Sequence, residues 1–194
     1  MKKKLQLFLL LFTLALTCAL LTGCASCDAG AESTDESVTT PEKLAYTVNS
    51  DGITCAVTGL GTVRGGELVI PDAIDGYRVV AIDADAFLGA AITSLTLPNT
   101  VVEIGSNAFY GCTRLSRVTL SENLSVIREG AFRGCVTLSS IRLPERLSKI
   151  EEDAFYGCRS LTEVYDLTSD LDVQAGSSDN GSVGRYAESI RKSK

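Results

Sequence analysis

Apolar and small residues recur at fixed offsets through the middle of the chain. Phe87, Phe109, Phe132 and Phe155 are separated by 22, 23 and 23 residues, and each has an alanine before it and a glycine two positions after it. Nine positions of one unit return 23 residues later. They are Ile104, Ala108, Phe109, Gly111, Cys112, Leu115, Val118, Leu120 and Leu124, repeated as Ile127, Ala131, Phe132, Gly134, Cys135, Leu138, Ile141, Leu143 and Leu147. A period of this length predicts an array of stacked structural units.

Each unit contains one short segment in which apolar and polar residues alternate. In SRVTL, Val118 and Leu120 fall on one face of a strand, while Arg117 and Thr119 fall on the other. The Ala-Phe-x-Gly segment predicts a single helical or turn-like rung on the opposite wall, where the glycine lets the backbone turn. Because one unit cannot enclose its own apolar face, the units must stack, and we expect a parallel solenoid.

A cysteine follows the glycine in three of the units. Cys112, Cys135 and Cys158 should form one inward column, and Ala90 takes the equivalent place in the first unit, which favours a packing role. We expect buried free thiols. A disulfide between adjacent turns and a metal site are the alternatives, although three cysteines in a line lack tetrahedral placement.

The segment IGSNAFYGCTRLSRVTLSENLSV and its copies resemble the BspA-type leucine-rich repeat. The resemblance covers residues 67 to 165, and ELVIPDAIDGYRVVAID at 67 to 83 is similar to the half-repeat that opens such arrays, with an insertion around Asp75-Gly76. It implies a leucine-rich-repeat solenoid of parallel short strands with helical or turn rungs, in about four repeats over residues 67–166. It also implies a location at the cell surface.

The flanks of the array lack its period. YTVNSDGITCAV alternates around a turn sequence, so residues 44–66 should form a β-hairpin that caps the N-terminal end of the solenoid. Asp166 stands where a leucine is expected, and the period is lost after it. Residues 167–194 are therefore either a C-terminal cap or a flexible tail.

The N-terminus has the features of a secretion signal. Lys2, Lys3 and Lys4 precede an apolar run that ends in LTGC, which resembles a bacterial lipobox. We expect residues 1–23 to be a lipoprotein signal peptide, Cys24 to be lipidated, and residues 24–43 to be an acidic disordered tether. The expected location is the bacterial cell envelope, lipid-anchored and extracytoplasmic. The alternatives are an uncleaved membrane anchor and, for the CASC motif, a redox pair.

Composition narrows the possible chemistry. The 194 residues contain no histidine, which excludes Ser-His-Asp and Cys-His nucleophiles and histidine-dependent metal sites. The net charge is −6, with no basic excess of the kind that nucleic acid requires. The acidic run Glu151, Glu152 and Asp153 is interpreted as a solvated surface. We expect no enzyme activity, no cofactor, no metal and no nucleic-acid partner.

The outward strand positions are the best candidates for ligand binding. Alternation places Arg117 and Thr119 beside Ser140 and Arg142, followed by Glu163 and Tyr165, and arginine and tyrosine are enriched in binding hot spots. The alternative is that these residues form an ordinary solvent-facing row that binds no ligand. The preferred function is a cell-surface lipid-anchored binding module that adheres, through the solenoid surface, to an extracellular protein or to a matrix or cell-surface ligand. A structural or assembly subunit of the cell envelope is the alternative.

Overall fold

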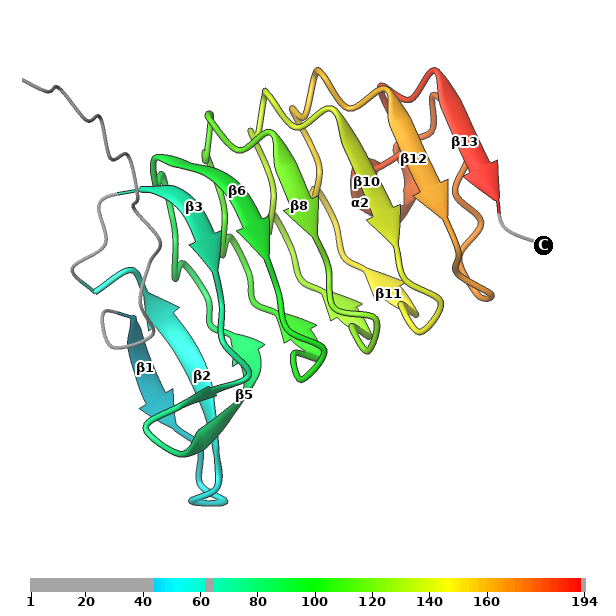
Figure 1. Cartoon of the computed structure of the whole chain (residues 1–194). Coiled ribbons are helices and arrows are strands. Elements are labelled where there is room, and N and C mark those ends of the chain that lie inside the picture. The colour runs from blue at the N-terminus through cyan, green and yellow to red at the C-terminus, as the bar shows by residue number, and fades with distance from the viewer. Residues whose placement is uncertain (1–43, 62–64, 193–194) are drawn as a thin grey trace, which may run out of the picture. The chain divides into compact units, whose positions relative to one another are not determined.

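The protein is described by a computed structural model that covers residues 44–61 and 65–192. The predicted signal peptide, Cys24 and the predicted tether lie outside these described residues. Figure 1 shows the described chain as two rows of strands joined by turns. The parallel solenoid that the period predicts is confirmed.

The first row contains the strands that the alternating segments of the repeat predict, together with one further strand at the C-terminal end that they do not predict. They are β3 (Gly66–Val69), β6 (Ile92–Thr96), β8 (Arg117–Thr119), β10 (Ser140–Leu143), β12 (Glu163–Asp166) and β13 (Ser189–Lys192). Figure 1 shows them side by side with all arrows pointing the same way. Pairing is parallel in the order β3-β6-β8 and again in the order β10-β12-β13. We call the solvent-exposed side of these six strands the strand face.

A second sheet forms another wall of the solenoid, and it begins with the N-terminal cap. It contains β1 (Ala45–Val48), β2 (Thr54–Gly59), β4 (Ala73–Ile74), β5 (Tyr77–Ile82), β7 (Glu103–Ile104), β9 (Val126–Ile127) and β11 (Lys149–Ile150). The antiparallel β1-β2 pair confirms the hairpin. β2, β5, β7, β9 and β11 then pair in parallel. Sequence patterning identified Ile104 and Ile127 as core positions but not as strands, because two residues are too short to show alternation.

The Ala-Phe-x-Gly segments form turns that hydrogen-bond from one unit to the next. Phe87 N–H donates to Ala108 at 2.7 Å, Phe109 N–H to Ala131 at 2.8 Å, and Phe132 N–H to Ala154 at 2.7 Å. The four phenylalanine rings stack with centroids 5.1, 5.2 and 5.2 Å apart, at interplanar angles of 7°, 8° and 13°. All four are at most 1% exposed. The rungs are therefore turns rather than helices, and the phenylalanine column is their shared core.

The residue that precedes each Ala-Phe pair has a left-handed backbone. Its φ is 56° at Asp85, 54° at Asn107, 62° at Gly130 and 55° at Asp153. Asn, Asp and Gly are the residues that tolerate this conformation at least cost. The left-handed backbone at the start of the turn thus explains why the residue before each Ala-Phe pair is Asp, Asn or Gly.

The cysteines form the inward column that the repeat predicts. Cys112, Cys135 and Cys158 are 0% exposed, and they are free thiols, as is Cys55. Each of the three thiols in the column also donates a hydrogen bond to the carbonyl of a phenylalanine in the preceding turn. Cys112 donates to Phe87 at 3.1 Å, and the other two make the equivalent contacts at 3.2 and 3.1 Å. Sequence reasoning predicted the burial but not this polar link between turns.

The solenoid continues past the point where the sequence period ends. Asp166 is 2% exposed inside β12, where its Oδ1 accepts hydrogen bonds from Thr168 N–H at 3.0 Å and Thr168 Oγ1 at 2.6 Å. The chain then passes through α2 (Asp179–Ser182) and adds β13 beside β12. At the other end, the insertion at Asp75-Gly76 forms the β4-β5 hairpin. The solenoid therefore has about six turns, more than the four repeats expected, because the first and last turns depart from the repeated pattern.

Candidate functional site

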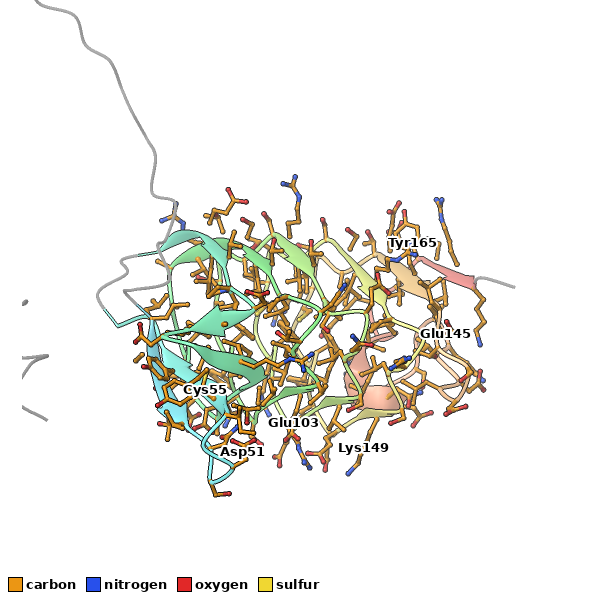
Figure 2. All side chains as sticks on the ribbon, turned by 60° about the horizontal axis from the view of Figure 1, so that its bottom comes forward. Asp51, Cys55, Glu103, Glu145, Lys149 and Tyr165 are labelled. Carbon is orange, nitrogen blue, oxygen red and sulfur yellow. The ribbon has the colours of Figure 1, made fainter. Side chains whose placement is uncertain are left out.

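Strand register arranges the strand face into two rows of outward side chains. In one row, Ser94 pairs with Arg117, and Ser140 pairs with Glu163 and then Ser189. In the other, Thr96 pairs with Thr119, and Arg142 pairs with Tyr165 and then Arg191. The predicted residues Arg117, Thr119, Arg142, Glu163 and Tyr165 all lie on this face, and Tyr165 projects from it in Figure 2.

A hollow of about 220 Å³ opens in the middle of the strand face. It lies at a seam, because β8 and β10 are neighbours in the row but belong to different sheets. Its lining consists of Arg117, Val118, Ser140, Ile141, Arg142 and Tyr165. The side chains of Val118 and Ile141 are buried in the core, so their backbone forms the floor. The structure brings Arg117, Arg142 and Tyr165 together around the hollow and leaves Thr119 and Glu163 outside its lining.

A third arginine joins this group from the C-terminal strand. The guanidinium carbon of Arg191 lies 5.5 Å from the centroid of the Tyr165 ring, within the range of a cation–π interaction. The Tyr165 hydroxyl in turn donates to Glu163 Oε2 at 3.1 Å. Sequence reasoning missed Arg191, because it follows Tyr165 by 26 residues instead of 23. The only signal was the short alternating segment SIRK at 189 to 192.

None of the ion pairs between described side chains involves Arg117, Arg142 or Arg191. All three arginines are exposed. Guanidinium groups offer a planar fork of donors that matches carboxylates, and here those donors face solvent. The strand face therefore carries three cationic groups that form no ion pair with the other described residues.

Charge is arranged differently on the exposed side of β7, β9 and β11, which we call the ladder face. Arg128 donates to Glu103 at 2.7 Å and to Glu151 at 3.1 Å, and Lys149 donates to Glu151 at 2.8 Å. The hydrogen bond to Glu103 raises the pKa of Arg128, and the one from Lys149 lowers the pKa of Glu151. A hollow of about 330 Å³ beside this network is lined by Asp83, Glu103, Arg128 and Glu151 among others.

The acidic run at 151 to 153 is not simply a solvated surface, as the sequence suggested. Glu151 belongs to the ladder-face network, and Asp153 pairs with Arg133 at 2.6 Å. Neighbouring turns supply the two arginines, because stacking places residues about 23 positions apart side by side, whereas Lys149 comes from the same turn as Glu151. The run therefore links turns, and its charges are largely satisfied within the chain.

The turns expose a third surface, the turn face, defined by Tyr110, Arg133, Tyr156 and Arg185. Arg133 and Arg185 lie 5.0 and 5.3 Å from the centroid of the Tyr156 ring. Tyr110 is 41% exposed and Tyr156 is 38% exposed. Because two guanidinium groups contact Tyr156 and one of them is paired with Asp153, this surface has fewer free donors than the strand face.

The thiol column offers no reactive nucleophile. Burial raises the pKa of Cys112 to about 11 and that of Cys158 to about 12, and it raises the pKa of Cys135 well above its ordinary value. Because their pKa values are raised, these thiols stay protonated at neutral pH. The thiolate is the reactive form, so the column is unreactive. Within residues 44–61 and 65–192, no group of Cys, Asp and Glu side chains is placed to hold a metal ion.

The described part of the chain contains no helix that is long and apolar enough to cross a membrane.

Comparisons with known proteins identify the class to which the solenoid belongs. The fold is a leucine-rich-repeat β-solenoid. Residues 80–173 match the BspA type leucine rich repeat region in six copies, so the chain carries a BspA-type leucine-rich repeat region. Repeat proteins of this class generally bind partners through extended surfaces and are not catalysts. A search of curated proteins gives no match.

Several crystal structures share the fold. A leucine-rich-repeat protein of T. pallidum is 34% identical with a TM-score of 0.66, over 71% of this chain and 64% of that one. A leucine-rich cell surface protein of Faecalibacterium prausnitzii A2-165 is 27% identical with a TM-score of 0.63, over 78% and 38%. A leucine-rich-repeat protein of Bacteroides capillosus ATCC 29799 is 26% identical with a TM-score of 0.54, over 79% and 96%. The chain thus spans less than two thirds of the first two proteins.

Proposed function

We propose that the protein is a lipid-anchored binding module of the bacterial cell surface, and that it adheres to a protein of a host matrix or of a neighbouring cell through the strand face. The observation that carries this proposal is the group of Arg117, Arg142 and Tyr165 around one hollow. Arginine and tyrosine supply both contact area and directed hydrogen bonds at binding hot spots. The similarity to a protein described as a cell surface protein supports the location.

The size of the strand face suggests how it works. Six strands spaced about 4.8 Å apart span roughly 24 Å, and each exposes about 10 Å of its length. The resulting area is a few hundred Å², below the roughly 800 Å² that each partner buries in a standard stable interface. One copy should therefore bind weakly, and many copies on one membrane should bind through avidity.

The test is a pull-down from host extracellular matrix and, separately, from envelope extracts, with the full chain in a nonionic detergent as bait. We expect a matrix or cell-surface protein to be retained by the wild type and lost in the triple variant Arg117→Ala, Arg142→Ala, Tyr165→Ala. The matched control is Arg78→Ala, Arg133→Ala, Tyr156→Ala, which removes the same side-chain types elsewhere. Circular dichroism checks that both variants fold.

Two results would contradict the proposal. Retention of the partner by the folded triple variant would move the binding site away from the strand face. Recovery of a single envelope protein, with no matrix or cell-surface protein bound, would favour the alternative of a structural or assembly subunit.

The anchor is tested separately. Cys24→Ala should block lipid attachment and leave the precursor uncleaved or misplaced, because the lipobox cysteine is the acylated residue. Metabolic fatty-acid labelling, followed by fractionation, measures the effect. Labelling that persists in this variant would show that the lipobox assignment is wrong. Cys27→Ala is the matched control and should be labelled normally.

A further inference from the structure

We propose that the ligand segment recognised by the strand face is a short, extended, acidic peptide within a partner protein, and that Arg117, Arg142 and Arg191 bind its carboxylates. This inference rests on the proposed function and names the chemistry of the partner. It concerns one surface, namely the hollow at the β8-β10 seam together with the adjacent Tyr165 and Arg191.

The first argument is charge complementarity. The chain carries a net charge of −6, and on the other faces Arg128, Arg133 and Lys149 are each paired with a carboxylate. Arg117, Arg142 and Arg191 lie on one face of the solenoid, and none of them forms an ion pair with another described residue. Carboxylates from a ligand would neutralise these cations while accepting paired hydrogen bonds.

The second argument is preorganisation. Arg142, Tyr165 and Arg191 occupy three consecutive strands at the same register position. The contact of Arg191 with the Tyr165 ring restricts its side chain, so less conformational freedom is lost when a carboxylate binds. That guanidinium forms no ion pair with another described residue, so its N–H groups can donate to a ligand carboxylate.

The third argument selects a peptide. Along the row, Arg142 and Arg191 are two strand spacings apart, or about 10 Å. In an extended peptide, side chains two residues apart lie about 7 Å from each other on one side, within reach of flexible Glu and Arg side chains. Beside Arg142, the hollow of about 220 Å³ at the β8-β10 seam has room for a small side chain against the Tyr165 ring and the backbone floor.

A long sulfated polysaccharide fits this surface less well. A polyanion that crossed the whole domain would meet the net negative charge of the rest of the chain. A short acidic segment meets only the local arginine cluster. Glu163 opposes even that segment, because its carboxylate lies beside the cluster and accepts the hydrogen bond of Tyr165. Neutralising Glu163 should therefore strengthen the binding of an acidic ligand.

The experiment measures fluorescence anisotropy with the full chain in a nonionic detergent. The probe is a fluorescein-labelled peptide in which glutamates alternate with valines, and the reference is the same peptide with lysine in place of glutamate. We expect the acidic peptide to bind and the basic one not to bind. Raising the salt from about 0.1 M to about 1 M shortens the screening length from about 10 Å to about 3 Å and should weaken binding.

Variants locate the binding site. Arg117→Gln, Arg142→Gln and Arg191→Gln should each weaken binding about three- to tenfold, the scale of one lost charge-assisted contact at an exposed site. Glu163→Gln should strengthen it about two- to threefold. The triple control Arg78→Gln, Arg128→Gln, Arg133→Gln removes the same charge from other faces, and it should change binding less than twofold.

Every other outcome overturns the inference. If the control triple weakens binding as much as the single substitutions of Arg117, Arg142 and Arg191 do, the attraction comes from overall charge and not from this site. If heparin binds and the acidic peptide does not, the ligand is a polysaccharide. If the protein partner from the pull-down depends on the strand face while the acidic peptide does not bind, the peptide chemistry is wrong and the proposed function stands. If neither binds the strand face, both fail.

Discussion

The strand face and the ladder face are built on the same solenoid core, yet their charges are arranged in opposite ways. On the ladder face, Arg128 lies between Glu103 and Glu151, and each charge meets an opposite one. On the strand face, Arg142 and Arg191 lie on the strands to either side of Tyr165, and neither forms an ion pair with another described residue. Figure 2 shows Tyr165 on one side of the domain and Glu103 and Lys149 on the opposite side.

The two faces differ in how they use the positions that the repeat does not fix. Both faces consist of solvent-facing positions, which the repeat leaves free to vary because they do not contribute to the core. On the ladder face, the free positions are used to link adjacent turns. On the strand face, they hold cations that do not link turns, and stability alone gives no reason for such a cluster. The fold is shared by both faces, so the site has to be argued from its side chains.

The largest expected effect removes the support that both faces share. Phe132 is 0% exposed and stacks on Phe109 and Phe155, each at 5.2 Å between ring centroids. Phe132→Ala should lower the free energy of unfolding by about 3 to 5 kcal/mol, through lost burial and the cavity left behind. Thermal and denaturant unfolding measure the effect, and both faces should lose structure together. Tyr110→Ala, which removes an exposed ring, is the control and should cost far less. An unchanged melting temperature in Phe132→Ala would contradict the stacked-column core.

The next prediction concerns the pH dependence of stability, which tests the buried core without involving either face. Burial raises the pKa of Cys112 to about 11 and of Cys158 to about 12, and also that of Cys135, from an ordinary value of 9.0. A raised thiol pKa means that the folded state keeps protons which the unfolded state releases. The stability that the buried thiols contribute is therefore fully present below pH 9 and is lost progressively as the pH rises above it. The loss should be about 1.4 kcal/mol per pH unit for each thiol, up to its folded pKa.

Denaturant unfolding between pH 8 and pH 11 measures this loss. The variant Cys112→Ala, Cys135→Ala, Cys158→Ala is the control, since Ala90 already fills the equivalent place in the first unit. Its stability should fall less steeply over the same range, whatever its stability at pH 8. Equal slopes for the variant and the wild type would show that alkaline unfolding starts from surface charges and not from the thiol column.

Much of the fold could be predicted from the sequence, because core positions repeat without change. The phenylalanine, cysteine and leucine columns are each tied to one place in the turn, so a 23-residue shift reveals them. The two-residue strands of the ladder-face sheet could not be predicted, since Glu103–Ile104 is too short for a pattern. The final strand was also missed, because Asp166 interrupts the apolar column. Its burial depends on hydrogen bonds from Thr168, which no periodicity encodes.

The candidate site could be predicted only in part, for a related reason. Alternation placed five residues on one side of the strands, and the observed strand register agrees with this placement. They are Arg117, Thr119, Arg142, Glu163 and Tyr165. The hollow depends on a break in pairing between β8 and β10, and the third arginine arrives from a strand that is out of phase with the repeat. The ion pairs of the ladder face were missed as well, because contacts between side chains one turn apart depend on rotamers and not on period.

The smallest expected effect tests the comparison directly. Arg128→Ala removes the central cation of the ladder face, whose side chain is 39% exposed. Exposed ion pairs contribute little, so the melting temperature should fall by less than about 4 °C at neutral pH.

The pKa of Glu151 is lowered in the folded state, first by Lys149 and then by Arg128. The stability that this carboxylate contributes is therefore present above its ordinary pKa of 4.5 and is lost as the pH falls below it. The difference between Arg128→Ala and the wild type should therefore shrink in acid. Calorimetry at neutral pH and below pH 4 measures this, and acidic-peptide binding at neutral pH should stay within twofold of the wild type. A loss of binding as large as that of Arg142→Gln would mean that the two faces are not distinct in function.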